Sequence, residues 1–166
     1  MPDQLRLMGV LAHPDDESLG LGGTLAHYAS KGVETYLVTA TRGERGRHGD
    51  EGTHPGLEVV GRMREAELRE AARVLGVRDV QFLDYVDGDL DSADPGEAVA
   101  KIVQHLRRVK PHVVVTFAPD GAYGHPDHIA VSQFCLAAVT AAADDSFIAS
   151  DGLPPHRVSK LYFMAW

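Results

Sequence analysis

The sequence predicts an α/β fold, a Rossmann-like and mostly parallel sheet with helices on both faces. Two observations predict this class. Short runs rich in β-branched and apolar residues alternate with longer segments of helical periodicity, which is the pattern of repeated βαβ units. Polar segments rich in glycine, proline and acids follow several of the β-type runs. Because ligands of open α/β sheets bind at the carboxyl ends of the strands, we expect the active site in those segments.

The elements follow in order from local patterns. The expected strands are residues 5–12, 33–40, 80–83, 112–118 and 158–165. The expected helices are residues 22–32, 57–76, 97–110 and 129–143. The first helix has Leu21, Leu25 and Tyr28 on one face and Gly32 as its stop signal. Residues 41–56 read as a long polar loop with five glycines. These elements make one domain, residues 1–166, with no internal repeat or linker.

Charge and composition exclude several classes of partner. The net charge is −8, from 24 acidic and 16 basic residues, whereas nucleic acids and anionic membranes require a basic face. No apolar run reaches the roughly 20 residues that cross a bilayer, and the N-terminus lacks the pattern of a signal peptide. The single cysteine, Cys135, excludes an internal disulfide and favours a reducing compartment. We therefore expect a cytoplasmic protein that binds a small molecule.

Common catalytic motifs are absent where the fold would place them. The segment "HPDDESLGLGG" after the first strand lacks the glycine order of a dinucleotide site, the lysine of a P-loop and a nucleophile elbow. The one basic cluster is "TRGERGRHGDEG", residues 41–52. Its arginines alternate with glycine and acids, which favours a solvated loop over a loop whose arginines touch substrate.

The first candidate site is the cluster His13, Asp15, Asp16 and Glu17, directly after the first strand. Zinc takes imidazole nitrogen and carboxylate oxygen at about 2 Å. His13 and Asp16, three residues apart on a tight turn, could reach one ion, and Asp15 would lie close enough to deprotonate a bound water. The alternative is a helix start that is merely enriched in acids, which is how we interpret Glu17.

The second candidate site is "YGHPDH", Tyr123 to His128, at the end of the strand 112–118. It repeats the H-P-D pattern of the first cluster and adds a histidine. An H-x-x-D and an H-x-x-H at the carboxyl ends of parallel strands can converge in one crevice, and two histidines, an aspartate and water make a catalytic zinc site. The same ligands admit iron, manganese or cobalt. Spacing alone does not distinguish His125 from His128 as the ligand.

The paired motifs "AHPDDE" and "GHPDH" resemble the LmbE-like, PIG-L-type superfamily of metal-dependent de-N-acetylases. "GGTLAHYASKG", "TRGERG", "REAELREAARVLGV" and "FLDYVDGDL" are similar to family segments in the same order, so the resemblance covers most of the chain. It implies a zinc-dependent hydrolase of linear amides that removes acetate from an N-acetylglucosaminyl conjugate, as in mycothiol or bacillithiol synthesis. Asp84 departs from the pattern, since family members often have glycine there.

The resemblance also implies roles at matching positions. His13, Asp16 and His128 would hold the zinc ion. Asp15 would be the general base that activates the zinc-bound water.

Further residues would assist the reaction. His125 would stabilise the oxyanion, with Tyr123 as a second donor, and Asp127 would orient or tune His125. The resemblance also assigns contacts with the sugar to Arg64 and Asp87.

Two other hypotheses stay open at this point. A binding or scaffold protein could share the fold without catalysis. A metal-dependent phosphoesterase would usually need two metals and bridging carboxylates. The chain stops at Trp166 directly after the last expected strand, so we expect either a naturally short member or one that lacks its C-terminal portion. The sequence leaves the oligomeric state open, a homo-oligomer included.

Overall fold

The computed structural model describes residues 4–47, 55–148 and 152–165, and it confirms the expected fold class. Five strands form one sheet in the order β3-β2-β1-β4-β5, and every neighbouring pair is parallel. The strands are β1 (Arg6–Leu11), β2 (Glu34–Thr41), β3 (Val77–Tyr85), β4 (Val113–Phe117) and β5 (Lys160–Met164). The helices are α1 (Gly22–Ser30), α2 (Leu57–Leu75), α3 (Pro95–Val109), α4 (Gly121–Gly124) and α5 (Pro126–Ala142).

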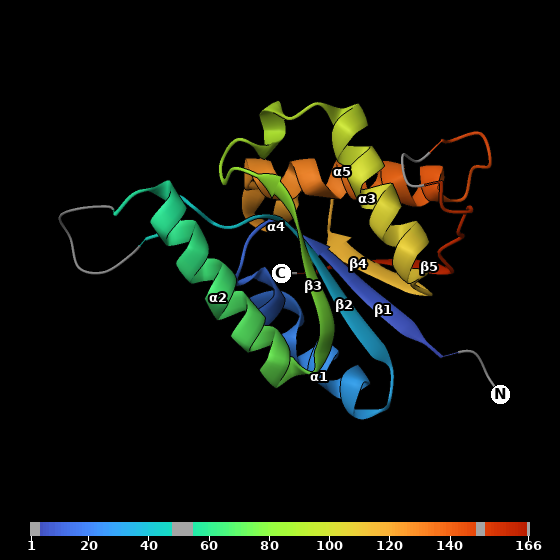
Figure 1. The fold of residues 1–166 in the computed structure, drawn as a ribbon, viewed down its shortest axis with the longest axis horizontal. Coiled ribbons are helices and arrows are strands. Elements are labelled where there is room, and N and C mark those ends of the chain that lie inside the picture. The colour runs from blue at the N-terminus through green and yellow to red at the C-terminus, as the bar shows by residue number, and fades with distance from the viewer. Residues whose placement is uncertain (1–3, 48–54, 149–151, 166) are drawn as a thin grey trace.

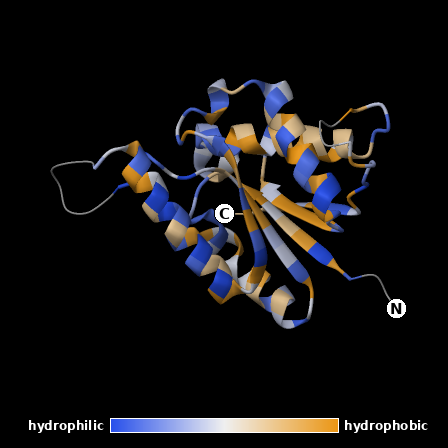
Figure 2. Ribbon diagram, in the orientation of Figure 1, coloured by the Kyte–Doolittle hydropathy of each residue, from blue (hydrophilic) through white to orange (hydrophobic). Residues whose placement is uncertain are grey.

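The helices cover the sheet in two pairs. Helix α1 packs beside α2, and α3 packs beside α5. Figure 1 shows the strands running between these two pairs. The strands, largely hydrophobic, lie in the middle, whereas the helices mix hydrophilic and hydrophobic residues (Figure 2). In the part of the chain that the structure describes, no helix has the length and apolar character needed to cross a membrane.

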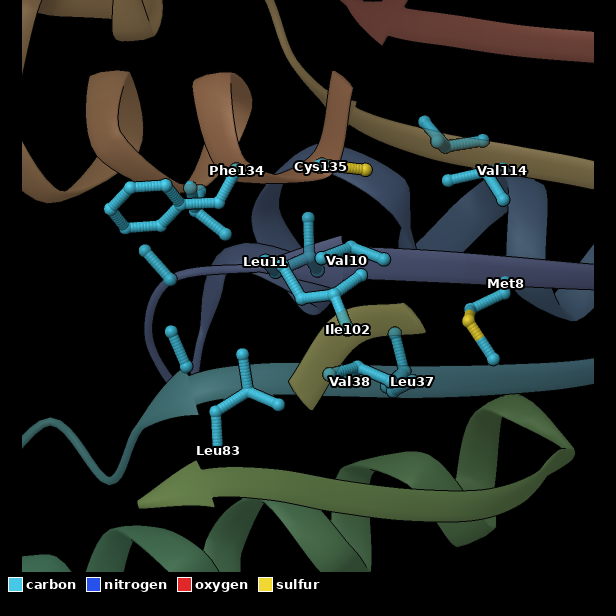
Figure 3. Close-up of a cluster of buried hydrophobic side chains, with 14 of the residues drawn as sticks. Met8, Val10, Leu11, Leu37, Val38, Leu83, Ile102, Val114, Phe134 and Cys135 are labelled. Atoms are coloured by element: carbon cyan, nitrogen blue, oxygen red, sulfur yellow. The ribbon is translucent and has the colours of Figure 1, made fainter. Parts of the chain in front are cut away.

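The hydrophobic core between the sheet and α5 holds the strands in place. Val10, Val114 and Cys135 have no exposed surface, and they pack with Ile102 of α3 in one continuous cluster (Figure 3). Burying each aliphatic side chain of this size contributes about 1.5–3 kcal/mol. Parallel strands covered on both faces read as almost continuous apolar runs, which is why the sequence shows little alternation in them.

The structure differs from the expected elements in places that matter for the site. Helix α5 begins at Pro126 rather than at residue 129, because His125 caps it and proline suits the first helical position. The second His/Asp cluster therefore belongs to a helix start. A five-residue π-helical turn, η1 (Glu17–Leu21), follows the first cluster. Strand β3 extends on both sides of the expected residues 80–83.

The strand order places the two clusters side by side. The chain runs from β1 outward to β2 and β3, and then crosses to β4 on the other side of β1. In the register of β1 and β4, Leu7 pairs with Val113 and Gly9 with Val115. The carboxyl ends of these two strands flank the switch in strand order, where α/β sheets bind ligands.

Candidate metal and catalytic site

Three donor groups from the two clusters converge beside β1 and β4. His13 Nδ1 lies 3.2 Å from His128 Nε2, and Asp16 Oδ1 lies 3.5 Å from the same Nε2. His13 Nδ1 and Asp16 Oδ2 are 3.8 Å apart. All three side chains are buried. Ligands about 2 Å from one tetrahedral zinc ion lie about 3.3 Å from one another. The His13–His128 pair has this spacing, whereas Asp16 faces His128 with Oδ1 and His13 with Oδ2. Among the described residues, single donor atoms within 4.8 Å of one another occur in the groups His13, His125, His128 and His13, Asp87, Asp127.

His13 is oriented by two carboxylates. Its Nε2 lies 2.9 Å from Asp127 Oδ2 and 3.2 Å from Asp87 Oδ1, which leaves Nδ1 facing His128 and Asp16. A metal-binding histidine commonly donates its other ring N–H to a carboxylate in this way. Burial by itself lowers the pKa of His13, but the hydrogen bonds to Asp127 and Asp87 outweigh it and raise that pKa to about 10. The surroundings of His13 therefore favour positive charge.

Asp16 is a buried carboxylate with one oxygen committed to the backbone. Its Oδ2 accepts hydrogen bonds from the amides of Ala12 and His13, at 3.1 Å and 2.8 Å. Its Oδ1 faces His128. Burial raises the pKa of Asp16 to about 6, although the charge on His13 opposes this. A buried carboxylate needs a proton or a cation beside it, and the charge on His13 is one such cation.

His128 provides a neutral imidazole. Its ring stacks on the buried ring of Phe117, with centroids 3.8 Å apart and planes 11° apart. Burial, with the charges on His13 and His125, lowers the pKa of His128 to about 4. Within the described ranges, no hydrogen bond of full geometry reaches its buried Nδ1, although a backbone hydrogen bond with Gly121 acts on the ring and favours its charged form. A neutral ring that aims Nε2 at the other donors has the form of a metal ligand.

His125 occupies a different place in the cluster. It is the N-cap of α5, and its Nδ1 accepts a hydrogen bond of 3.2 Å from the backbone amide of Asp127. An acceptor Nδ1 leaves the proton on Nε2, so the ring is set up as a donor. Ring nitrogens of His125, His13 and His128 lie within 4.8 Å of one another. Distance alone would therefore also allow His125 as a ligand, but its hydrogen bonding favours a donor role.

The Asp127 carboxylate contacts His13 rather than His125. Besides the bond to His13 Nε2, its oxygens accept the backbone amides of Gly88 and Leu90, at 2.7 Å and 3.2 Å. Only the backbone amide of Asp127 reaches His125. The orienting contact expected toward His125 is thus made to His13. The cause is the helix start, which turns this fully buried side chain toward β1 and the turn after β3.

Asp15 lies at the rim of the cluster. Its carboxylate is half exposed and accepts a 2.7 Å hydrogen bond from Arg64 Nη2, and Arg64 also donates to the Pro14 carbonyl. The φ angle of Asp15 is 112°, which a residue with a Cβ rarely adopts and which often marks a functional site. Buried Asp16 and rim-facing Asp15 are thus consecutive residues with opposite environments.

Tyr123 lies on the short helix α4 and is 70% exposed. Its ring centroid is 5.3 Å from that of His128 and 6.0 Å from that of His125. The preceding residue, Ala122, has φ 67° and ψ −81°. Burial, followed by the charges of nearby carboxylates including Asp16, raises the pKa of the phenol. Tyr123 therefore keeps its proton and can donate it in a hydrogen bond.

The two residues expected to touch the sugar lie next to the cluster. Asp87 contacts His13, and Arg64 contacts Asp15. A cavity of about 230 Å³ adjoins Asp15 and Arg64, with Leu19 and Glu67 also lining it. A larger cavity of about 630 Å³ lies between α1 and β5 and contains none of these catalytic candidates. The candidate site is therefore identified by its His and Asp side chains and not by the volume of its cavity.

The arginines of "TRGERG" bind carboxylates, a pairing that neither sequence interpretation of this loop included. Arg45 binds Asp89 through two 2.7 Å hydrogen bonds, and the amide of Arg45 donates to Asp87 Oδ2. Glu44 accepts the amide of Asp87 at 3.0 Å. The loop thus clamps the turn that carries Asp87. In the sequence, the alternation of Arg and Glu in this loop, together with the acidic "DYVDGDLD" segment, could have indicated this ion pairing. Residues 48–54 of this loop lie outside the described ranges.

Backbone geometry explains two other sequence features near the clamp. A Cβ on Gly46 would lie 2.0 Å from Arg64 Nη1, and one on Gly43 would lie 2.9 Å from Arg64 Nε. These glycines therefore make room for the guanidinium that contacts Asp15. Asp84, where family members often have glycine, has a φ of 61°. Aspartate tolerates this left-handed region better than most residues, and Arg42 binds the Asp84 carboxylate at 2.6 Å.

The chain is similar to proteins of known family. The model of the PIG-L family, described as GlcNAc-PI de-N-acetylase, matches residues 8–139. A 1D-myo-inositol 2-acetamido-2-deoxy-alpha-D-glucopyranoside deacetylase of Kineococcus radiotolerans is 39% identical over 183 residues, covering 95% of this chain and 51% of that protein. The Rhodococcus opacus protein of the same name is 41% identical, covering 95% and 60%. The chain thus spans about half to three fifths of the length of these relatives.

A solved structure agrees in fold and carries a related name. The N,N'-diacetylchitobiose deacetylase from Pyrococcus horikoshii has a TM-score of 0.83 and 28% identity, over 93% of this chain and 57% of that one.

Proposed function

This chain belongs to the PIG-L family, as its motifs suggested, and on that premise we propose that it is a metal-dependent hydrolase that removes the acetyl group from an N-acetylglucosaminyl conjugate. The observation that carries the proposal is the convergence of His13 Nδ1, His128 Nε2 and the Asp16 carboxylate, buried and 3.2–3.8 Å apart. They come from motifs more than a hundred residues apart, and each is oriented by a contact that leaves a donor atom facing the others.

The proposed cofactor is zinc, held by His13, Asp16 and His128. Nitrogen and oxygen ligands suit zinc but also admit iron and other divalent metals. When bound, such a cation acts as a Lewis acid on the amide carbonyl and makes water a stronger acid. The carboxylates of Asp127 and Asp87 would keep the His13 ring directed toward it, because both contact Nε2.

Asp15 is the proposed proton carrier. Water adds to the acetyl carbon, the bond from that carbon to nitrogen breaks, and acetate and a free amine are formed. The Asp15 carboxylate, exposed at the rim, would take the proton from the attacking water and deliver it to the leaving nitrogen. Its ion pair with Arg64 would hold the carboxylate in place between these two transfers.

His125 and Tyr123 are the proposed donors to the oxyanion. The capping hydrogen bond at Nδ1 leaves His125 with an N–H on Nε2, and the Tyr123 ring lies beside it. Donors already oriented toward developing negative charge stabilise the transition state without reorganisation. Arg64 and Asp87, at the edge of the same cluster, are the proposed sugar contacts.

The proposed substrate is a small amino-sugar conjugate, and the proposed location is the cytoplasm, since the single cysteine is a buried free thiol. We also propose that residues 1–166 act as one domain.

Turnover and metal content test the function together. The full chain, loaded with zinc, is assayed for amine release from N-acetylglucosamine, N,N'-diacetylchitobiose and the inositol glycoside named for the relatives. Asp15→Asn should retain zinc and lose about 100- to 10,000-fold in kcat, the usual contribution of a general base. Asp91→Asn, an exposed carboxylate outside the cluster, is the matched control and should keep wild-type turnover.

Two results would count against the proposal. Wild-type turnover in Asp15→Asn would remove the base from the mechanism. Stoichiometric zinc with no amine release from any of these compounds would favour a metal-binding protein without hydrolase activity.

A further inference from the structure

Glu17 has a buried carboxylate that the proposed reaction does not use. Glu17 comes directly after Asp16, a proposed metal ligand, and it is almost fully buried, at 2% exposure. Oε2 accepts the backbone amide of Asp15 at 3.0 Å, and Oε1 accepts the hydroxyl of Ser18 at 2.6 Å. Within the described residues, no ion pair involves Glu17. A helix-start acid, as the sequence suggested, would normally face solvent, so this burial needs another explanation.

The backbone that Glu17 contacts is held in an unfavourable conformation. Asp15 has φ 112°, and residues with a Cβ remain there only when their surroundings hold them. The Asp15 carbonyl accepts the amides of Ser18 and Leu19, at 3.0 Å and 2.9 Å, and its amide donates to Glu17. Both peptide groups of Asp15 are therefore fixed, the amide by a buried carboxylate.

This conformation separates two consecutive carboxylates. Asp16 turns inward, with its side chain 6% exposed, while the Asp15 side chain stays 51% exposed and reaches Arg64. Arg64 holds the side chain of Asp15, and Glu17 holds its backbone. Because a buried donor left without its acceptor costs about 1–3 kcal/mol, the Glu17 contact is suited to keeping a strained residue in place.

We propose that Glu17 is a positioning residue, which holds the Asp15 backbone so that the Asp15 carboxylate faces the substrate while Asp16 faces the metal. The proposal rests on the proposed function, because it takes Asp15 as the base. Glu17 itself would touch neither substrate nor metal. Its loss should lower kcat and leave KM nearly unchanged.

Three variants separate positioning from packing. Glu17→Met fills the buried space without an acceptor, Glu17→Gln keeps an acceptor oxygen for the Asp15 amide, and Ser18→Ala removes only the hydroxyl bonded to Oε1. We expect kcat to fall about 10- to 100-fold in Glu17→Met, the effect of one hydrogen bond to a charged group. Glu17→Gln should recover most of that loss, and Ser18→Ala should stay within about twofold of wild type. KM and zinc content should match wild type in all three.

A second measurement keeps this proposal separate from the proposed function. Amide hydrogen exchange of Asp15, measured by NMR on the metal-free protein, should be slow in wild type and Ser18→Ala and fast in Glu17→Met. If wild type releases no amine from any substrate, the proposed function fails, but the exchange result still decides whether Glu17 holds Asp15. The positioning role is overturned if Glu17→Met keeps wild-type kcat, or if the Asp15 amide exchanges equally fast with and without the carboxylate.

Discussion

Two buried polar regions of this molecule differ in how completely their groups are paired. The first is the donor cluster of His13, Asp16 and His128. The second is Arg107 of α3, which is 3% exposed and whose guanidinium reaches backbone carbonyls at the C-terminal end of α5. Arg107 makes hydrogen bonds of 2.8–3.3 Å to five backbone carbonyls, those of Ala141, Ala142, Asp144, Phe147 and Leu153. A guanidinium has five N–H donors, so this region matches donors to acceptors completely.

The donor cluster lacks that match. His128 Nδ1 has no hydrogen bond of full geometry among the described residues, burial raises the pKa of Asp16, and two further carboxylates surround His13. Buried polar groups that are fully paired stabilise a fold, whereas incompletely paired groups cost stability and are kept for function. The comparison predicts that changes at Arg107 act on stability, and that changes at the cluster act on metal binding and turnover.

The largest expected effect is at His128. In His128→Leu we expect turnover to fall by more than about 1000-fold, because one of the three proposed metal ligands is lost. The metal-free variant should be as stable as the metal-free wild type, since a leucine can pack against Phe117 without an unpaired nitrogen. Calorimetry with and without zinc checks this. Zinc at 100 times its Kd should stabilise wild type by about 2.7 kcal/mol and the variant by much less. A strongly destabilised metal-free variant would contradict the comparison.

The second-largest expected effect is a loss of stability on substitution of Arg107. Arg107→Met removes five hydrogen bonds from a charged donor, although the carbonyls of Ala141, Ala142 and Asp144 keep a backbone amide donor. We expect the free energy of unfolding to fall by about 3–5 kcal/mol. The neighbouring Arg108 is half exposed and has a 3.6 Å ion pair to Asp79 and a 3.1 Å contact with His105 Nδ1. Both are exposed contacts, so Arg108→Met should change stability by less than about 1 kcal/mol. Denaturant unfolding of both variants measures the difference. The kcat of the Arg107→Met fraction that remains folded should equal that of wild type; a loss of kcat in the folded fraction would couple the two regions.

A smaller effect tests the support of Asp15. A Cβ on Gly46 would collide with Arg64, so Gly46→Ala should displace the guanidinium and lower kcat about tenfold, with little change in stability. Gly23→Ala is the control. Gly23 lies in helix α1, and a Cβ at this position meets no atom within 4 Å. That control should keep its activity and gain about 0.5–1 kcal/mol of stability. Equal activity of the two variants would show that Arg64 is not needed to hold the base.

Local patterns in the sequence determined the alternating elements, the parallel sheet and the residue types of both clusters. The reason is that helical periodicity, apolar strands and an H-P-D motif are properties of a few neighbouring residues. The motif resemblance similarly pointed to the PIG-L family before any geometry was known.

Tertiary structure decided which groups meet. Strand pairing put β4 next to β1, and so brought His128 within 3.2 Å of His13 across 115 positions. Tertiary packing also placed the Asp127 carboxylate in a hydrogen bond with His13, and it buried Glu17 where its carboxylate accepts the Asp15 amide. Contacts of this kind depend on packing between distant segments, and no local period encodes them. Sequence therefore proposed the ligands of the site, while the residues that contact those proposed ligands became visible only in the folded chain.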